Sequence, residues 1–322
     1  MNLAIKLPDT IREIIQTFPL LHAINKILND RWENEEIDNY QIHLICLDKI
    51  VNVLNLLPIK AYYHQLEEED TKNVFSIHRA IKNATLDNVD VFVSTTRSFV
   101  DASIGKNLNA KTRVGFGIGK NKVFFNKNIS FLEGQHASNI FFNLIQFLDL
   151  DEIPKIPNVT VRNLDSYYPD YRENPYFVIN LKLNEEKRLD SQWIDFFELF
   201  KDQNFILCMD GDAEIVKDSI ESLISTLPKG NHYKFFDSQN VIDFGKMISY
   251  SKGFFTGDSD LLYIAAYCGA TCFWMNEKLN ASLEFPEYFY SDVKRYDAKQ
   301  LAGNFSSVFD DIYSFLDVKE DT

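Results

Sequence analysis

Several features that mark other protein classes are absent from this 322-residue sequence. No apolar run reaches the roughly 18 residues that a membrane-spanning helix requires. The start, MNLAIKLPDT, lacks the basic region, apolar stretch and small-residue cleavage site of a secretion signal, so we expect none. The stretch GFGIG at 115–119 has the wrong spacing for a dinucleotide-binding fingerprint. These absences favour a cytoplasmic protein that does not bind a nicotinamide cofactor.

Cysteine is also scarce, and its pattern does not suggest a metal. The four residues are Cys46, Cys208, Cys268 and Cys272. The last two form a C-x3-C pair, but neither a second pair nor a nearby histidine completes a zinc site. We therefore expect buried, reduced thiols and no metal.

Positive charge is in short supply, and the deficit lies in one half of the chain. The net charge is −14. Residues 1–150 hold 16 Lys and Arg against 17 Asp and Glu, whereas residues 151–322 hold 17 against 30. Because phosphate neutralisation needs clustered basic residues, this balance argues against nucleic acid as a partner. Solubility is the simplest interpretation of the acidic half.

The first half alternates short apolar runs with helical patterns. Strands are predicted at 3–7, 41–47, 60–66, 90–95 and 112–116, and helices at 11–28, 72–84, 97–107 and 135–148. Pro19 should kink the first helix or mark where it restarts. The acidic run LEEED at 66–70 is interpreted as a solvated loop. Alternation of this kind predicts a parallel sheet with helices on both faces.

After a proline-containing linker at 151–163, the pattern restarts. Strands are predicted at 175–183, 204–210, 232–236, 253–257 and 271–275, with helices at 190–202, 213–226, 240–250 and 260–268. We therefore expect an α/β protein with two doubly wound, Rossmann-like domains facing a cleft, at 1–155 and 156–296. The segment 297–322 should form a C-terminal helix that can pack back on the first domain. Ligands in such folds lie beyond the carboxyl ends of the strands.

Motifs along most of the chain resemble those of glycosyltransferase family 9, the lipopolysaccharide heptosyltransferases. Near the start, Lys6 follows the first strand, and REIIQTFPLL (12–21) resembles a segment with Gly-Asp ahead of TLPAL. This match places Arg12 at the glycine and Glu13 at the aspartate. RVGF (113–116) is similar to the family's RIGF, and 136–154 is similar to its His-led helix and the loop after it.

In the second half, INLKLNEEKRLDSQW (179–193) resembles the family's strand and sugar-phosphate loop, which places Lys187 at its donor-phosphate lysine. GDSDLLYIAAYCGATCFWM (257–275) resembles xDTGxxHLAAALGxPxxxxxG. Asp258 and Ser259 match Asp-Thr, whereas Asp260 replaces the glycine and Tyr263 the histidine.

The resemblance implies a metal-independent bacterial glycosyltransferase with the GT-B arrangement. It would transfer a sugar, with inversion, from a nucleotide diphosphate donor such as ADP-heptose to a lipopolysaccharide-core, other glycan or lipid-linked acceptor. Catalysis is expected from Glu13 as the base and Lys187 as the phosphate cation. The donor-binding residues are expected to be Asn180, Lys182, Asp258, Ser259, Asp260 and Tyr263. Any membrane contact would be peripheral, at the inner face of the inner membrane and through the nearly neutral first half.

Each assignment has a structural alternative. Glu13 is also an ordinary first-turn acid favoured by the helix dipole. Lys187 can pair with Glu185 or Glu186 in solvent. Asp260 can cap the helix that follows it, with its side chain on a backbone N–H group, and so occupy amides that would hold phosphate.

The altered motifs also keep other functions open. One is a degenerate relative that retains the fold as a binding or scaffold protein. Another is a transferase whose acceptor is a polypeptide.

Overall fold

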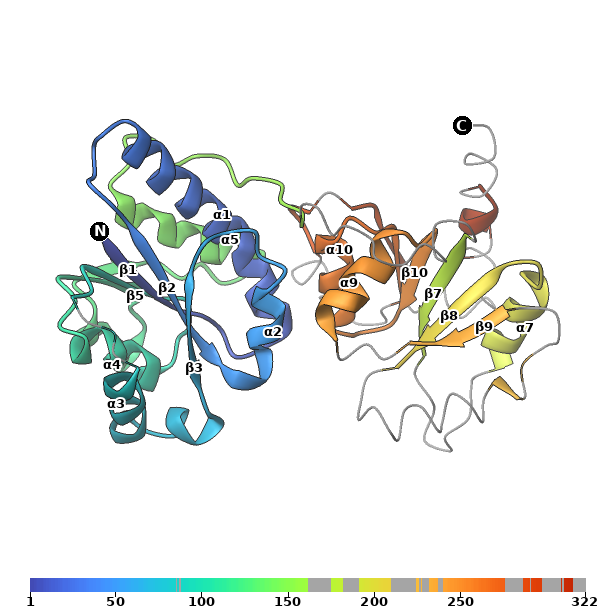
Figure 1. Ribbon diagram of the computed structural model, residues 1–322, viewed down its shortest axis with the longest axis horizontal. Helices are drawn as coiled ribbons and strands as arrows, with labels where there is room; N and C mark the ends of the chain where they lie inside the picture. Colours follow the sequence, from blue (N-terminus) through green and yellow to red (C-terminus); the bar gives the residue numbers. More distant parts are fainter. Residues whose placement is uncertain are drawn as a thin grey trace. The chain divides into compact units, whose positions relative to one another are not determined.

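The computed structural model describes residues 1–84, 86, 88–161, 175–181, 191–209, 224–225, 227, 232–236, 240–275, 286–289, 291–296, 308 and 310–314. The chain divides into two compact units (Figure 1). One comprises Met1–Val159 with Leu283–Tyr288, and the other Thr160–Ser282 with Phe289–Thr322.

The first unit is built on a parallel sheet with strand order β3-β2-β1-β4-β5-β6. The strands are β1 (Asn2–Lys6), β2 (Gln41–Leu47), β3 (Tyr62–Leu66), β4 (Val91–Ser94), β5 (Thr112–Phe116) and β6 (Lys127–Ile129). The α-helices are α1 (Ile11–Glu33), α2 (Val51–Leu54), α3 (Val74–Asn83), α4 (Phe99–Asn107) and α5 (Ala137–Phe142). Short 3-10 helices are η1 (Asp48–Ile50), η2 (Glu68–Thr71), η3 (Gly119–Phe124) and η4 (Asn143–Leu148).

Helix α1 begins where the sequence signals a start and ends later than predicted. The side chain of Thr10, its N-cap residue, accepts a hydrogen bond from the backbone N–H of Glu13. The helix then runs through Pro19 without a restart and ends at Glu33. Its buried residues, including Ile15, pack its apolar face into the unit.

The second unit repeats the same winding, with strand order β12-β11-β10-β7-β8-β9. Its strands are β7 (Tyr176–Asn180), β8 (Asn204–Cys208), β9 (His232–Phe235), β10 (Gly253–Thr256), β11 (Cys272–Met275) and β12 (Val293–Tyr296). Its described helices include α7 (Ser191–Leu199), α9 (Val241–Ser249) and α10 (Leu261–Tyr267). All strand pairs of this sheet are parallel. The strand order shows that each sheet reverses its direction of winding once, between β1 and β4 in the first sheet and between β7 and β10 in the second.

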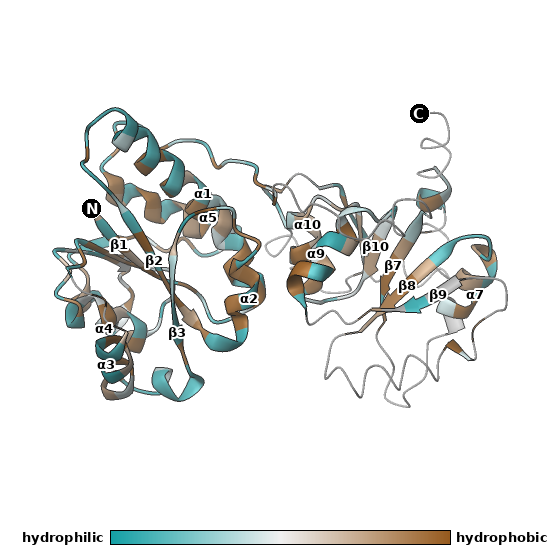
Figure 2. Cartoon of the chain, in the orientation of Figure 1, coloured by the Kyte–Doolittle hydropathy of each residue, from teal (hydrophilic) through white to brown (hydrophobic). Residues whose placement is uncertain are grey.

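Hydrophobic residues run along the strands of both sheets (Figure 2), and the core of the second unit is rich in phenylalanine. Phe255 and Phe273 stack with ring centroids 4.5 Å apart. Val308 and Ile312 belong to this same core. The described residues of the C-terminal segment thus pack on the second unit. The sequence analysis had considered packing on the first domain instead.

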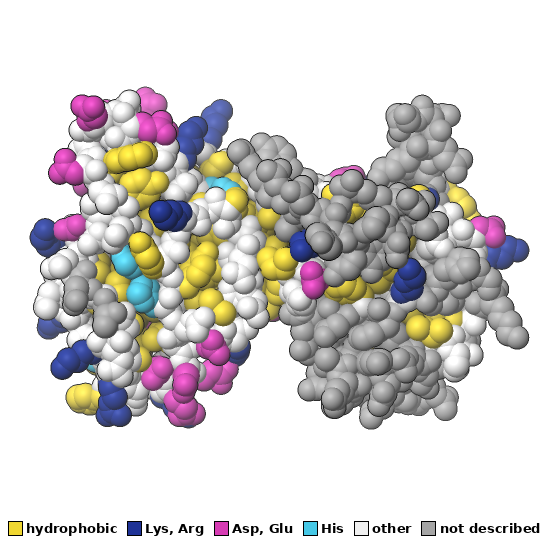
Figure 3. Space-filling model, in the orientation of Figure 1, with side chains coloured by type: hydrophobic (Ala, Val, Ile, Leu, Met, Phe, Trp, Pro, Cys, Tyr) yellow, Lys and Arg dark blue, Asp and Glu magenta, His cyan; other side chains and the backbone are white. Residues whose placement is uncertain are grey.

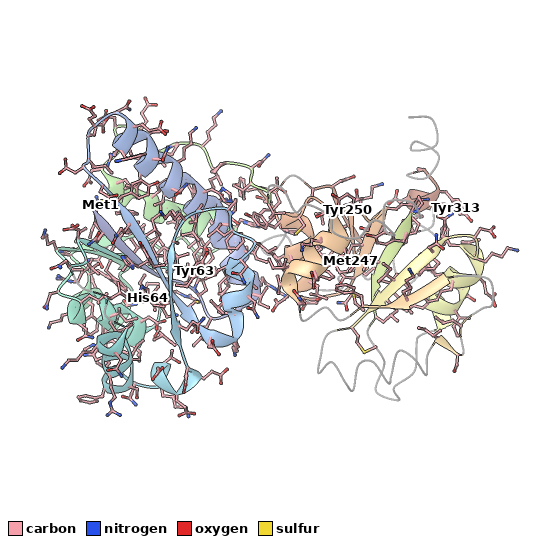
Figure 4. All side chains as sticks on the ribbon, viewed as in Figure 1. Met1, Tyr63, His64, Met247, Tyr250 and Tyr313 are labelled. Carbon is pink, nitrogen blue, oxygen red and sulfur yellow. The ribbon has the colours of Figure 1, made fainter. Side chains whose placement is uncertain are left out.

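A pair of histidines lies on the edge of the first sheet. His43 Nδ1 of β2 is 3.0 Å from His64 Nε2 of β3, and Tyr62 stacks on His43 with centroids 5.1 Å apart. Figure 3 shows histidine side chains beside hydrophobic ones on this face of the first unit, and Figure 4 labels His64.

The structure confirms the predicted fold class of two doubly wound parallel sheets. The sequence interpretation missed β6, β12 and the short α2. The helix predicted at 213–226 falls almost wholly outside the described residues. All four cysteines are free and buried. Within the described residues, no helix combines the length and apolar character needed to cross a membrane.

Candidate functional site

The reversal of strand order in the first sheet opens a pocket at the carboxyl ends of β1 and β4. Crevices of this kind are where open α/β sheets bind ligands. The pocket has a volume of about 300 Å³. Its lining includes Asp9, Glu13, Thr96, Arg97, Asp101 and Phe131. These residues come from the segment after β1, the first turn of α1, the segment after β4, the start of α4 and the segment after β6.

Lys6, the last residue of β1, is fully buried and anchors the charges of this pocket. Its ammonium group donates to Asp9 Oδ1 and to the Leu7 carbonyl, each at 2.7 Å, and lies 3.8 Å from Asp101 Oδ2. Thr96 Oγ1 donates to the same Asp101 oxygen at 2.8 Å. Burial raises the pKa of the Asp101 carboxyl, and the charge of Lys6 opposes that shift. The network fixes Asp9 and Thr96 on the pocket wall.

Glu13, the expected base, lines the pocket and also takes part in the helix cap. Its backbone N–H donates to Thr10 Oγ1 at 3.3 Å, and that hydroxyl donates to Glu13 Oε2 at 3.0 Å. The residue is exposed in the first turn of α1. Glu13 is therefore an acidic residue in the first turn of α1, as the structural alternative to a catalytic role described it. A carboxylate in this position is also open to a bound hydroxyl.

Besides Asp101, two charged residues of the pocket were missed by the sequence interpretation. Asp9 follows β1, and its side chain is 44% exposed beside Lys6. Arg97 follows β4 and holds its guanidinium 4.6 Å from the ring centroid of Phe131. The signal that could have found both is their place directly after strands, at the carboxyl edge of a parallel sheet.

The corresponding point of the second sheet brings together the ends of β7 and β10. Asn180 Nδ2 donates to Thr256 Oγ1 at 3.1 Å, and both residues are buried. The structure thus places the predicted Asn180 beside the start of the turn that holds Asp258, Ser259 and Asp260. Thr256 was not singled out from the sequence, because it looks like an ordinary strand residue.

Within that turn, Ser259 rather than Asp260 supplies the helix cap. The Leu261 N–H donates to Ser259 Oγ at 3.1 Å, whereas the Asp260 side chain makes no cap hydrogen bond. The capping role considered for Asp260 is therefore wrong, because the hydroxyl one residue earlier already meets the amide. Asp258 is exposed, Asp260 is half-buried and Tyr263 is 1% exposed.

The other expected site residues, Lys182 and Lys187, lie outside the described residues, as do Glu185 and Glu186. In the part of the chain that the structure describes, no three His, Cys, Asp or Glu side chains gather as ligands for a metal ion. The use of a metal therefore stays a matter of prediction.

Comparison with known proteins identifies the fold and gives no family match by sequence. No protein-family model matches the chain, and no curated protein matches it significantly. Solved structures do match. The heptosyltransferase WaaC of E. coli with ADP superposes with a TM-score of 0.73 at 13% identity, covering 98% of this chain and 100% of that one.

Two further structures give similar results. The ADP-heptose lipopolysaccharide heptosyltransferase II of E. coli has a TM-score of 0.70 at 12% identity and covers 100% of both chains. A family 9 glycosyltransferase of Veillonella parvula has a TM-score of 0.68 at 13% identity, covering 92% of this chain and 86% of that one. The resemblance to family 9 is thereby confirmed for the fold.

Proposed function

We propose that this protein is a glycosyltransferase that moves a sugar, with inversion, from a nucleoside diphosphate donor to a glycan acceptor. The observation that carries the proposal is that each sheet, taken by itself, has candidate residues at its own strand-order reversal. Glu13 lies at the strand-order reversal of the first sheet, and Asn180 and the 257–260 turn lie at that of the second, in a fold shared with heptosyltransferases. The reversal point is where this class of sheet binds ligands.

On the acceptor side, Glu13 is the proposed base. Its carboxylate takes the proton of an acceptor hydroxyl as that oxygen attacks the anomeric carbon of the donor sugar. The bond from that carbon to the diphosphate oxygen breaks at the same time, and the electron pair leaves with the nucleoside diphosphate. Thr10, which donates to Glu13 Oε2, holds the carboxylate in place for the transfer.

On the donor side, Asn180, Lys182, Asp258 and Ser259 are the proposed binding residues, and Lys187 is the proposed cation for the departing diphosphate. Asp260 and Tyr263 are the two residues of this site that depart from the family motif. A carboxylate at 260 adds negative charge where the resemblance places glycine, so we expect weaker donor binding than in a typical family 9 enzyme. ADP and ADP-heptose are the first ligands to test, because they are the ones named with the superposed heptosyltransferases.

The test is donor turnover by the wild-type protein and two variants. Glu13→Gln should lower the turnover number at least 100-fold, within the range usual for loss of a general base. Lys187→Ala should raise KM for the donor and lower the turnover number, because less positive charge then stabilises the diphosphate as its bond to the sugar breaks. Glu33→Gln, at the far end of α1, and Lys201→Ala, on the surface of the second unit, are the matched controls and should stay within twofold of wild type. Unchanged turnover in both site variants would overturn the assigned roles.

A second candidate, a scaffold protein that has lost transferase activity, is favoured by Asp260 and Tyr263 alone. The half-buried carboxylate and the buried tyrosine stand where the family motif has glycine and histidine. Measurable turnover of any nucleotide sugar would exclude this candidate.

A further inference from the structure

The histidine pair of the first sheet lies apart from the Glu13 pocket. His43 belongs to β2 and His64 to β3, the strand at the edge of the sheet. His64 is in register with Ile45, which lies two residues after His43, so both histidines are on the same face of the sheet. Neither of them is among the described residues that line the Glu13 pocket. Any chemistry of this pair is therefore separate from the proposed transfer reaction.

The two facing ring nitrogens are separated by a distance that suits two ligands of one metal ion. His43 Nδ1 and His64 Nε2 are 3.0 Å apart. A metal ion bonds an imidazole nitrogen at about 2.0–2.1 Å, so two such bonds at about 90–110° hold the nitrogens about 2.8–3.4 Å apart. The observed separation lies near the right-angled end of this range. That is the geometry of tetragonal Cu²⁺ and Ni²⁺ sites.

The hydrogen bond between the rings would give way to a metal ion without a change in their protonation. In the neutral pair one ring donates its N–H group and the other accepts. Moving the donated proton to the far nitrogen of its own ring, through solvent, frees the second lone pair. Rotation about χ2, a broad torsion in histidine, then turns both lone pairs toward one point. Neutral imidazole is the form that binds metals.

The pair is open to solvent at the edge of the sheet. Tyr62, the first residue of β3, is 50% exposed and stacks on His43 with ring centroids 5.1 Å apart. Histidine side chains are visible on this face of the first unit (Figure 3). A metal ion can therefore reach the two nitrogens from solvent and keep water at its other positions, while the Tyr62 ring steadies one imidazole.

The charge beside the pair also favours a cation. Four consecutive acids, Glu67 to Asp70, begin three residues after His64. Lysines pair with two of these acids, so a net negative charge remains. The whole chain has a net charge of −14. A negative field of this kind raises the local concentration of cations.

We propose that His43 and His64 form a binding site for a divalent transition-metal ion of the class that prefers imidazole, with Cu²⁺ bound more tightly than Ni²⁺ or Zn²⁺. The protein supplies two nitrogen ligands, and water supplies the others. Because one ligand comes from β2 and one from the edge strand β3, the bound ion ties this edge to the rest of the sheet. Mg²⁺ prefers oxygen ligands and should not bind here.

The experiment is calorimetric titration of the full chain, first stripped with a chelator, with CuCl₂ at pH 7.5 and with MgCl₂ as the control ion. Wild type should bind one Cu²⁺ per chain with a micromolar dissociation constant and should not bind Mg²⁺. The electron paramagnetic resonance spectrum of the copper complex should be tetragonal, with splitting from two imidazole nitrogens. His43→Gln and His64→Gln should each raise the dissociation constant at least tenfold and remove one nitrogen from the spectrum.

A matched control removes a histidine elsewhere on the first unit. His78 lies on α3 with Nε2 3.2 Å from Ser103 Oγ, and His78→Gln should bind Cu²⁺ within twofold of wild type. Melting curves without metal show whether each variant folds, and the wild-type spectrum tests the site without any variant. Unchanged affinity in His43→Gln or His64→Gln, an equal loss in His78→Gln, or fewer than two nitrogens in the wild-type spectrum would overturn the proposal. Because the assay contains neither donor nor acceptor, its outcome is independent of whether the chain transfers sugar.

Discussion

Lys6 and Asp101 form a buried ion pair at the reversal point of the first sheet, with Nζ 3.8 Å from Oδ2 and both side chains almost fully enclosed. The pair joins the end of β1 to the start of α4, and its Asp101 also lines the Glu13 pocket. It therefore connects the stability of the first unit with the shape of the candidate acceptor site.

Replacing the cation of this pair should be costly. Lys6→Met leaves the Asp101 carboxylate buried without its countercharge, which should lower the free energy of unfolding by about 3–5 kcal/mol. Urea denaturation measures this directly. The control is Lys111→Met, which removes a lysine that is 82% exposed and 2.8 Å from Asp90, and should cost about 0–1 kcal/mol. Equal losses of unfolding free energy in the two variants would show that the buried ion pair contributes no more stability than the exposed one.

The histidine pair should make stability depend on pH. Burial lowers the pKa of both His43 and His64 below the ordinary 6.5, and the charge of His43 further lowers that of His64. A lowered histidine pKa means that the unfolded chain takes up protons first, so the stabilisation is complete above pH 6.5 and lost as pH falls through the folded pKa.

The measurement is urea unfolding at pH 7.5, 6.5 and 5.5. Wild type should lose more stability over this range than the variant His43→Gln/His64→Gln. If wild type and the double variant lose the same amount of stability between pH 7.5 and 5.5, the histidine pair does not titrate as described.

Gly115 in β5 should not tolerate a side chain. A Cβ atom there would lie 2.3 Å from the ring of the buried Phe125, so Gly115→Ala should overpack the unit and cost about 1–3 kcal/mol. At Gly257 the nearest atom would be 3.7 Å away, and Gly257→Ala should leave the melting temperature within a degree or two. Comparable melting temperatures for the two variants would contradict the packing argument.

Asp260 should weaken donor binding through its charge. Two like charges about 4 Å apart repel by about 1 kcal/mol in water-like surroundings, which corresponds to about a fivefold change in affinity. Asp260→Gly and Asp260→Asn should therefore both tighten nucleotide diphosphate binding about fivefold in titration calorimetry. The control Asp195→Asn, on the exposed side of α7, should change nothing. Weaker binding by Asp260→Asn would mean that the carboxylate contributes to holding the ligand.

The fold was accessible from the sequence because hydrophobic runs and helical periods alternate clearly in both halves. β1 contains the apolar run LAI and β2 the run LICL, and short buried runs of this kind are typical of parallel strands. β6 and β12 were missed because KNI and VKRY are short and polar at the sheet edges. Their assignment depends on a neighbouring strand to pair with, which local sequence does not reveal.

The candidate site was predicted less completely. Asn180 lies beside the turn that holds Ser259, and its donor-binding role stays a prediction. The cap considered as an alternative for Asp260 is made by Ser259, because sequence alone does not separate neighbouring polar residues in a turn. Asp9, Arg97 and Asp101 were missed for a different reason. Asp9 is distant in the sequence from Arg97 and Asp101, and it meets them only when β1 and β4 become neighbours in the sheet.

The measurement that tests the account most directly is a thermal-shift panel of ADP, UDP, GDP, CDP and their sugar conjugates on the intact protein. A ligand at 100 times its dissociation constant stabilises the folded state by about 2.7 kcal/mol, which raises the melting temperature of a unit of this size by several degrees. The account predicts such a shift for one nucleotide, with a smaller shift for the others. The absence of a shift with every nucleotide at millimolar concentration would contradict a nucleotide-sugar transferase.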